Sequence, residues 1–382
     1  MTKDKQHINV PHLRFPEFTG EWERKSFKDV CNITTGNKNT QDKSDDGIYP
    51  FYVRSQIVER INSWTFDGEA ILTAGDGVGV GKVFHYSTGK IGVHQRVYIL
   101  SDFKCDGKYL YSYFAGNFYN RVKRMSAKNS VDSVRMEMIA DMPISLPSTE
   151  EQKKIGHLLA LLDERIATQN KIIKKYESLI KGLVVTHYST NLHTIKVKIG
   201  DLGETYSTMA MSKEQLTENG NPCIFYGELF TIYGCVIDKV KSRTWLDKNS
   251  STLSSGRDLL FPASTTVDAL SLIAPSALLE RDIILGGDMF GIKISKEYNP
   301  LYLSYYFNYI DNKRLSKYAK GTTIIHLHYN EITNVVIELP CIEEQDKIVT
   351  AIQRCSTKLA LEKTLLQRLS NLKQYLLSQM LI

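Results

Sequence analysis

The segment Leu146-Pro147-Ser148-Thr149-Glu150-Glu151-Gln152 recurs as Leu339-Pro340-Cys341-Ile342-Glu343-Glu344-Gln345, 193 residues further along a chain of 382. The match extends without a gap over residues 109–155 and 302–348. Fainter similarity lies upstream at a different offset, where Phe51-Tyr52 matches Phe225-Tyr226. The chain is therefore predicted to contain two copies of one unit, each with a globular part followed by a helix.

Both copies of the repeated segment predict the start of a long helix. Ser148 is a suitable N-cap, and Glu151 three residues later completes a capping-box pattern. Apolar residues then alternate at spacings of four and three, which is typical of a coiled coil. The predicted core of the helix pair is Ile155, Leu159, Leu162, Ile166, Gln169 and Ile173 in the first copy, and Ile348, Ile352, Leu359, Glu362, Leu366 and Leu369 in the second.

One polar residue interrupts the apolar stripe of each predicted helix at the same repeat position. These residues are Gln169 and Glu362, each at the midpoint of its helix. In an antiparallel pair the two midpoints meet, so the two side chains would form a buried polar pair that fixes the register. The alternative is that both residues lie on the surface of an imperfect stripe.

The predicted fold class is α+β, with two similar mixed α/β domains joined by two long antiparallel coiled-coil helices in a pseudo-twofold tandem repeat. The predicted boundaries are 1–146 for the first domain, 147–190 for its helix, 191–339 for the second domain and 340–382 for its helix. Strand patterns bounded by turn residues support the mixed α/β assignment. Residues 109–119 and 301–309 are predicted to be helices with their aromatic side chains in the core.

Composition narrows the class of protein without deciding it. The hydrophobic fraction of 42% and the charged fraction of 24% are those of an ordinary globular chain. A net charge of +6 permits a nucleic-acid partner but does not require one. The six cysteines show no zinc-site spacing and predict reduced thiols. The polar N-terminus and the lack of a long apolar run predict a cytoplasmic protein.

Three motifs resemble a phosphate-binding loop, a methyltransferase motif and a metal site, but each lacks residues that its chemistry requires. The glycine-rich segment Gly75–Lys82 lacks the first glycine and the final Ser or Thr of a phosphate-binding loop, so it reads as a turn that approaches a DNA phosphate or as a plain hairpin loop. Asn299-Pro300-Leu301-Tyr302 resembles a methyltransferase motif with one proline missing, and it reads as a helix start. His326 and His328 alternate on one strand face without further metal ligands nearby. The sequence therefore gives no positive reason to predict an enzyme.

Several segments in order resemble one family across essentially the whole chain. They are Pro11–Phe18 with Gly20-Glu21-Trp22, the doubled Leu-Pro-x-x-Glu-Glu-Gln helix start, Lys198–Leu202 opening the second unit, and Gly220–Leu229. Together they resemble the DNA-specificity subunit of type I restriction–modification systems. Each motif is weak alone, but their order and doubling are specific.

This resemblance implies a fold and a set of partners. Each domain would be a target-recognition domain that reads one half of a bipartite, asymmetric double-stranded DNA site, and the helices would set the gap between the halves. Two methyltransferase subunits would dock on the helices, and motor-nuclease subunits would join through the complex. S-adenosylmethionine, ATP and magnesium would be used by those partners, with no cofactor or metal in this chain and no catalytic residues.

Polar, glycine-punctuated segments between predicted strands supply the candidate DNA contacts, because loops carry recognition and Arg and Gln suit guanine and adenine edges. In the first domain they are Thr35, Asn37, Lys38, Asn39, Asp76, Lys82, His94, Gln95, Arg96, Lys128, Asn129 and Ser130. In the second domain they are Tyr226, Glu228, Arg257, Ser264, Thr265, Asp288, Thr322, Thr323 and His326.

Three other functions remain open at this point. The chain could be a stand-alone sequence-specific DNA-binding protein or regulator that dimerises through its helices. It could be a methyltransferase with fused recognition domains, although it lacks a glycine-rich cofactor motif. It could also be a scaffold built on the helices that binds no DNA. The target bases, the gap length and the stoichiometry of a complex do not follow from the sequence.

Overall fold

The computed structural model describes residues 9–125, 133–190 and 193–382. Contacts divide the chain into two compact units: unit 1 comprises residues 1–171 and 363–382, and unit 2 comprises residues 172–362. The division passes through both long helices. Each unit therefore holds part of each helix, whereas the boundaries read from the sequence keep the helices whole and separate from the domains.

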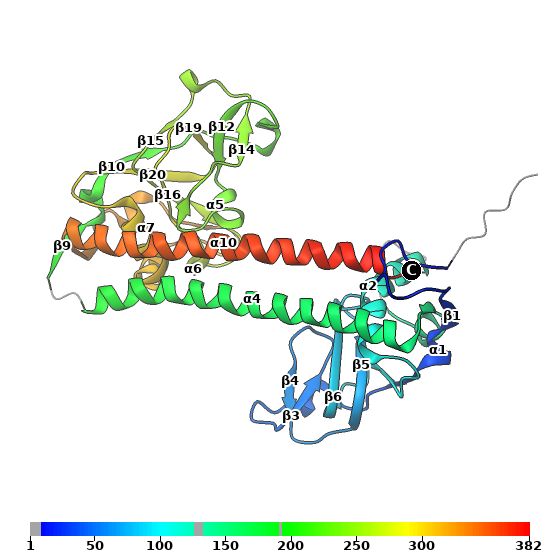
Figure 1. Ribbon diagram of the computed structural model, residues 1–382. Helices are drawn as coiled ribbons and strands as arrows, with labels where there is room; N and C mark the ends of the chain where they lie inside the picture. Colours follow the sequence, from blue (N-terminus) through cyan, green and yellow to red (C-terminus); the bar gives the residue numbers. More distant parts are fainter. Residues whose placement is uncertain (1–8, 126–132, 191–192) are drawn as a thin grey trace, which may run out of the picture. The chain divides into compact units, whose positions relative to one another are not determined.

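Unit 1 is a mixed α/β structure built around a twisted sheet (Figure 1). Its elements are β1 (Glu23–Ser26), α1 (Phe27–Val30), β2 (Asn32–Thr35), η1 (Thr40–Asp42), β3 (Tyr49–Tyr52), β4 (Glu59–Ile61), β5 (Phe66–Ala74), β6 (Phe84–Val93), β7 (Val97–Ser101), α2 (Gly107–Met125), α3 (Met136–Ala140), β8 (Pro143–Leu146) and the first part of α4 (Thr149–Thr190). The strand order of the main sheet is β2-β7-β5-β6-β3-β4, and β1 pairs separately with β8.

The core of unit 1 lies between this sheet and the aromatic helix α2. Phe114 and Phe118 stack with their ring centroids 4.5 Å apart, and Trp22 packs edge-on against Tyr109 at 6.3 Å. Tyr109, Tyr113, Phe114 and Phe118 are all buried, so the sequence-based assignment of these aromatics to the core is confirmed. The aromatic side chains bury a large apolar area and dominate the packing of such a core.

Unit 2 repeats this plan with a more divided set of strands (Figure 1). Its elements are the second part of α4, β9 (Thr194–Lys198), η2 (Ile199–Leu202), β10 (Gly203–Ser207), η3 (Lys213–Gln215), β11 (Leu216–Thr217), β12 (Asn221–Phe225), α5 (Glu228–Thr231), β13 (Val236–Ile237), β14 (Ser242–Thr244), η4 (Lys248–Ser250), β15 (Leu253–Ser255), β16 (Asp258–Pro262), β17 (Ser264–Thr265), α6 (Ala269–Leu272), β18 (Ser276–Leu278), β19 (Arg281–Gly286), β20 (Met289–Ile294), α7 (Pro300–Tyr309), α8 (Asn312–Leu315), η5 (Ser316–Tyr318), β21 (Ile325–His326), α9 (Tyr329–Ile332), β22 (Val336–Pro340) and the first part of α10 (Ile342–Met380).

The strands of unit 2 form two five-stranded sheets, ordered β10-β20-β16-β18-β13 and β11-β14-β12-β19-β15. Two short pairs, β17 with β21 and β22 with β9, complete the set among the described residues. Helix α7 packs over the first sheet, where Phe307 lies edge-on to Phe261, which in turn stacks on Phe290. The β22–β9 pair corresponds to the β8–β1 pair of unit 1, because both join the strand before a long helix to the start of a globular part.

The two long helices run antiparallel within each unit. In unit 1, Ile155 and Leu159 of α4 share a core with Met380 near the end of α10, and further along α4 Asp163 accepts a hydrogen bond from Lys373 at 2.5 Å. In unit 2, the end of α4 meets the start of α10, where His187 Nε2 lies 3.7 Å from Glu344 Oε2. The predicted antiparallel pairing is therefore confirmed inside each unit.

The residues of the predicted helix stripe are all buried or half-buried. Ile155, Leu159, Ile173, Ile348 and Ile352 are buried. The half-buried members of the stripe are Leu162, Ile166, Leu359, Glu362, Leu366 and Leu369. Gln169 is only 5% exposed, so it is not a surface residue. Because Gln169 belongs to unit 1 and Glu362 to unit 2, a contact between these two side chains stays a prediction.

The repeated Glu-Glu-Gln segment holds the same structural device in both units. The Gln152 side chain accepts a hydrogen bond from the Asp106 N–H at 3.0 Å and donates one to the Pro147 carbonyl at 2.8 Å. Gln345 likewise accepts from the Asn299 N–H at 2.9 Å and donates to the Pro340 carbonyl at 2.8 Å. Each glutamine is buried and ties the start of its long helix to the start of the aromatic helix of the same unit.

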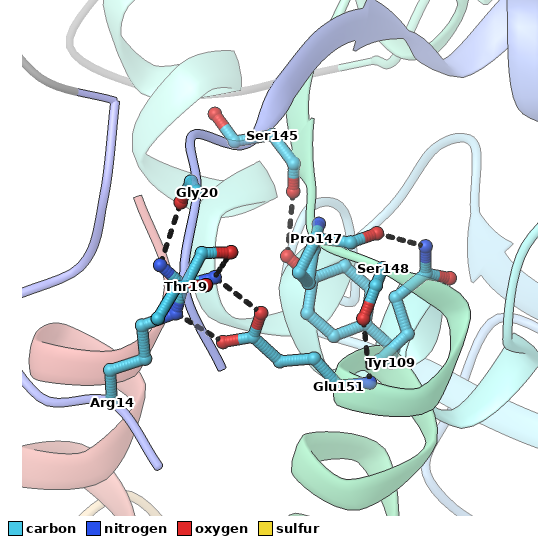
Figure 2. A network of polar contacts seen from close by, with 9 residues as sticks. Arg14, Thr19, Gly20, Tyr109, Ser145, Pro147, Ser148 and Glu151 are labelled. Carbon is cyan, nitrogen blue, oxygen red and sulfur yellow. Dashed lines mark hydrogen bonds and ion pairs between the residues drawn. The ribbon is translucent and has the colours of Figure 1, made fainter. Parts of the chain in front are cut away.

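The neighbouring glutamate differs between the units. In unit 1, Arg14 donates two hydrogen bonds of 2.8 Å to the carboxylate of Glu151, and it also donates to the carbonyls of Thr19 and Gly20 (Figure 2). The Glu151 N–H donates to the Ser148 hydroxyl at 3.3 Å, so only this half of the predicted capping box forms. The carboxylate pairs with Arg14 instead, because a bidentate guanidinium offers two charge-assisted hydrogen bonds.

Asn299 begins helix α7 rather than forming part of a catalytic motif. Its side-chain oxygen accepts hydrogen bonds from the N–H groups of Leu301 at 2.9 Å and Tyr302 at 3.2 Å. Pro300 occupies the first turn, where its missing N–H costs nothing. The helix-start reading of Asn299-Pro300-Leu301-Tyr302 is therefore confirmed.

Candidate nucleic-acid interface

The candidate surface of unit 1 begins where strand β5 ends and strand β7 starts. Ala74 pairs with Val97 across these antiparallel strands, and the N–H of Gly75 donates to the Arg96 carbonyl at 2.8 Å. The Gly75 carbonyl in turn accepts from the Val134 N–H at 2.7 Å. A Cβ atom at Gly75 would lie 2.9 Å from the Arg96 carbonyl oxygen, so this close approach favours glycine.

Three charged side chains meet beside this turn. Asp76 Oδ1 accepts a hydrogen bond from Arg54 Nη1 at 2.8 Å, and Asp76 Oδ2 lies 3.7 Å from Arg96 Nη1. The side chain of Arg96 is 65% exposed and that of Arg54 is 43% exposed. The cluster of Arg54, Asp76 and Arg96, hereafter the arginine cluster, carries a net charge of +1 and presents guanidinium donors to solvent.

His94 supports this cluster from beneath. Its side chain is buried, and its Nδ1 accepts the backbone N–H of Arg96 at 3.0 Å. Burial lowers the pKa of His94, the positive charges of Arg54 and Arg96 lower it further, and Asp76 opposes them. A neutral imidazole with an unprotonated Nδ1 is the form that can accept this hydrogen bond. His94 was predicted as a DNA contact, but its burial places it behind the surface.

The remaining predicted residues of unit 1 occupy two places. Thr35, Asn37 and Asn39 are exposed on the segment that leaves β2. Lys38 is half-buried and forms a parallel bridge with His94, and Gln95 donates to the Asn39 side chain at 2.7 Å. These residues therefore adjoin Arg96.

Lys82 lies apart from them at the end of the glycine-rich turn, with its ammonium 5.3 Å from the centroid of the Tyr119 ring. Val78 stands fully exposed at the tip of that turn. Lys128, Asn129 and Ser130 lie outside the described residues. Ser133, which follows them, forms an antiparallel bridge with Asp76.

Unit 2 has the same backbone arrangement at the end of strand β16. Pro262 pairs with Met289 across β16 and β20, and the N–H of Ala263 donates to the Asp288 carbonyl at 2.8 Å. The Ala263 carbonyl accepts from the Leu327 N–H at 2.9 Å. Asp288 Oδ2 lies 4.0 Å from His326 Nδ1, and both side chains are more than 40% exposed.

The short β17–β21 pair brings most of the predicted residues of unit 2 together. Ser264 is paired with His326, and Thr265 with Ile325. Thr322 and Thr323 are exposed on the turn that leads into β21. His326 and His328 stack with their ring centroids 5.9 Å apart, which confirms that the two imidazoles share a face.

Two clefts flank this strand pair in unit 2. One, of about 640 Å³, is lined by Tyr226, Ser264, Thr265 and Ile324 among others. The second, of about 490 Å³, is lined by Thr205, Thr208, Asp288, His328 and Asn330 among others. Asp288 therefore stands at a cleft bordered by hydroxyl, amide and imidazole groups.

Two predicted DNA contacts of unit 2 are occupied by structural hydrogen bonds. Glu228 is buried, and its carboxylate accepts from the Phe225 N–H at 2.9 Å and from the Ser242 hydroxyl. Arg257 donates to the carbonyls of Ile294, Ser295 and Tyr298 at 2.6 to 3.1 Å. Both side chains satisfy backbone groups at strand and turn ends, so the structure argues against direct DNA contact by either. Tyr226 is half-buried and packs against Phe225.

Arg54 was missed in the sequence. It follows Tyr52 by two residues, just as Glu228 follows Tyr226, and Phe51-Tyr52 matches Phe225-Tyr226 in the repeat. Glu228 was predicted as a DNA contact in the second copy of the repeat, so the same alignment could have pointed to Arg54 in the first copy. Arg54 and Asp76 are 22 positions apart in the sequence, so their contact does not follow from local spacing.

The described part of the chain contains no group of three or more His, Cys, Asp and Glu side chains that could hold a metal ion. Burial raises the pKa of Cys31 and of Cys223 to about 12, so these thiols are protonated at neutral pH. Within the same residues, every helix is too short or too polar to cross a bilayer.

Comparison with known proteins now decides the family. A family model described as the type I restriction modification DNA specificity domain matches residues 19–178 and, separately, residues 194–371. The chain belongs to the type I restriction–modification DNA specificity family. The resemblance inferred from the sequence motifs is thereby confirmed, and the two matches confirm that the chain is a tandem repeat. As a member of this family, the chain is a DNA-specificity protein.

Individual members of the family resemble the chain at low identity. The specificity subunit of the type I restriction enzyme EcoDI from Escherichia coli is 26% identical over 210 residues, which cover 54% of this chain and 43% of that protein. The specificity subunit of the enzyme MjaVIII from Methanocaldococcus jannaschii is 22% identical over 99% of this chain and 96% of its own length.

A solved structure has the same fold. The S subunit of a type I restriction–modification system from M. genitalium superimposes with a TM-score of 0.67 at 14% identity, over 98% of this chain and 99% of that one. The match extends over both copies of the repeat and both long helices, so the specificity family and this chain share one architecture.

Proposed function

We propose that the chain is the DNA-recognition subunit of a type I restriction–modification complex and that each unit reads one half of a bipartite, asymmetric site. The observation that carries this proposal is the shared backbone arrangement at the ends of β5 and β16, which bears different exposed side chains in the two units. A common frame with different polar groups suits two different half-sites, because base edges are distinguished by donor and acceptor patterns.

The long helices are the proposed docking surface for methyltransferase subunits. Apolar side chains stand exposed on both of them, at Leu161 and Leu179 of α4 and at Leu361, Leu372 and Tyr375 of α10. Each is at least 44% exposed, although large apolar side chains in a long helix usually pack against another element. Burial of these groups by a partner would make the association favourable.

In this proposal the chain supplies specificity and its partners supply the chemistry. The methyltransferase subunits would use S-adenosylmethionine, and motor-nuclease subunits joined through the complex would use ATP and magnesium. The chain itself would act without a cofactor and would bind double-stranded DNA in the cytoplasm. The modest net charge of +6 fits a subunit that gains part of its phosphate affinity from its partners.

The test is to express the chain together with the methyltransferase subunit of its own system in a host that lacks adenine methylation. Sequencing of methylated adenines should then reveal one bipartite motif with a fixed gap, and the motif should vanish without the chain. A stand-alone regulator would give no methylation and would not copurify with the methyltransferase. Methylation by the chain alone would instead indicate a fused methyltransferase.

A further inference from the structure

Arg96 and Asp288 occupy the same position in the two units. Each immediately precedes a central strand, β7 or β20, and the carbonyl of each accepts the N–H of the first residue after the neighbouring strand. Those donors, Gly75 and Ala263, lie 2.8 Å from the respective carbonyl oxygens. The backbone therefore holds the two side chains in equivalent settings.

The neighbouring bonds extend this equivalence. The residue that follows Gly75 is Asp76, which forms a β-bridge with Ser133. The residue that follows Ala263 is Ser264, which pairs in the same way with His326. Ser133 and His326 are 193 residues apart, which is the offset of the sequence repeat. The correspondence between Arg96 and Asp288 thus rests on hydrogen bonds and on the repeat together, although their immediate sequences differ.

The side chains of Arg96 and Asp288 each lie near one charged or titratable partner within their unit, at a distance too long for a hydrogen bond. Arg96 Nη1 is 3.7 Å from Asp76 Oδ2, and Asp288 Oδ2 is 4.0 Å from His326 Nδ1, which exceed hydrogen-bond distances. The two side chains remain 65% and 48% exposed. A guanidinium fork in unit 1 and a carboxylate in unit 2 are therefore available to a ligand at the same position.

We propose that this shared position reads one base of each half-site, with Arg96 selecting guanine and Asp288 selecting cytosine. This inference rests on the proposed function. In the major groove guanine presents two adjacent acceptors, O6 and N7, which match the donor fork of arginine. Cytosine presents the N4 amino donor, which a carboxylate accepts. Adenine adds the N7 acceptor beside its amino group, and that lone pair repels a carboxylate.

Asp76 and Arg54 complete the reading position of unit 1. The hydrogen bond between them neutralises Asp76, which would otherwise repel the phosphates of DNA. The remaining attraction of Asp76 for Arg96 limits the directions that the Arg96 fork samples. Unit 2 has Ser264 in place of Asp76, so Asp288 stands without a second carboxylate at that position.

The experiment compares methylation motifs of variants in complex with the methyltransferase subunit. Arg96→Lys keeps the positive charge and removes the planar fork, whereas Asp288→Asn keeps the shape and adds a donor. Arg96→Lys should lower the preference for guanine at one position of one half-site by about fivefold or more, because the bidentate pair that discriminates guanine from the other bases is lost. Asp288→Asn should relax a cytosine in the other half-site by a similar factor.

Two matched variants serve as controls. Arg24→Lys makes the same change at an exposed arginine of the β1–β8 pair, outside the main sheet of unit 1. Glu204→Gln removes an exposed carboxylate beside Lys293, at the opposite end of the β10–β20 ladder from Asp288. Neither control should change either half of the motif.

The outcomes separate this inference from the proposed function. If the wild-type complex methylates no bipartite motif, the proposed function fails and this inference fails with it. If the wild-type motif is bipartite but Arg96→Lys and Asp288→Asn leave both halves unchanged, only this inference is overturned. A uniform loss of methylation at all sequences would also overturn it, because that result indicates phosphate contact. A change confined to opposite half-sites supports it, and a melting curve for each complex confirms that the variants are folded.

Discussion

His94 shows how a buried residue can support an exposed one. Its ring Nδ1 accepts a hydrogen bond from the backbone N–H of Arg96. The backbone N–H of His94 donates to the Tyr52 carbonyl at 3.0 Å. Burial and the two nearby arginines lower its pKa below the ordinary value of 6.5, so the folded protein favours the neutral ring. Protonation would place a hydrogen on the nitrogen that must accept, and would add a positive charge beside Arg54 and Arg96.

The lowered pKa predicts a pH dependence with a defined sign. The stability that comes from neutral His94 is fully present above pH 6.5 and is lost as the pH falls through the lower folded-state pKa. Between pH 7 and pH 5 the melting temperature of the wild-type protein should therefore fall more than that of His94→Asn, whose side-chain oxygen can accept the same hydrogen bond without titrating. Parallel curves for the two proteins would contradict this role for His94.

At the scale of elements, each long helix begins with an equivalent hydrogen-bonded glutamine, Gln152 or Gln345. The two helix starts differ in the partner of the glutamate that precedes this glutamine. Glu151 is 1% exposed and is held by two hydrogen bonds from Arg14 (Figure 2). Glu344 is 37% exposed and lies near Lys347 and His187. The N-terminal segment of unit 1 thus supplies the cation that pairs with Glu151, whereas the cation beside Glu344 is Lys347 of the same helix, α10.

This difference predicts unequal effects of removing each cation. Arg14→Ala leaves the buried carboxylate of Glu151 without a partner and should destabilise unit 1 by about 3–5 kcal/mol. Lys347→Ala removes an exposed, solvent-screened partner and should leave the free energy of unfolding nearly unchanged. Urea unfolding followed by circular dichroism measures both free energies. The double variant Arg14→Ala with Glu151→Gln should recover part of the loss, and equal losses for Arg14→Ala and Lys347→Ala would refute the assignment.

At the scale of the whole molecule, unit 1 is completed by residues from a distant part of the chain, whereas unit 2 is one continuous stretch. The last turn of α10 enters the core of unit 1, where Met380 is 3% and Leu381 is 7% exposed. The N–H of Leu13 also donates to the Gln379 carbonyl at 2.9 Å, which joins the two distant segments. In unit 2 the corresponding place holds Ile180 and Val184 of α4.

Met380→Ala should therefore weaken unit 1 selectively. Removal of a buried methionine side chain costs about 2–5 kcal/mol, because the transfer energy is lost and a cavity remains. Hydrogen exchange should accelerate in α2 and in the β1–β8 pair, while α7 of unit 2 keeps its protection. Ser378→Ala, at an exposed position, is the matched control and should stay within about 0.5 kcal/mol of the wild type. Equal acceleration in both units would contradict the division of the core.

Local patterns accounted for most of the architecture. The helix starts at Thr149 and Ile342, the aromatic cores of α2 and α7 and the antiparallel pairing within each unit all followed from spacing and repetition. Such features depend on residues close in sequence or on a repeated register. The half-formed capping box at Ser148 departs from the pattern, since Arg14 lies more than 130 residues from Glu151 and takes its carboxylate.

The candidate surface was predictable in outline and not in detail. Arg96, Asp288 and the turn before β21 were identified because polar loops between strands carry recognition. Glu228 and Arg257 looked the same in the sequence, yet both bind backbone groups inside unit 2. Arg54 was overlooked because its partners, Asp76 and Arg96, lie far along the chain.

By itself, the sequence determined the family, the tandem repeat and the places where the long helices begin, because these depend on motif order and on short-range periodicity. The tertiary structure alone decided which polar side chains are free to meet a ligand. That choice depends on which backbone N–H and carbonyl groups the strand ends leave unpaired, and a buried unpaired group must find a partner from anywhere in the fold. Arg257 and Glu228 meet that need, and Arg96 and Asp288 remain exposed.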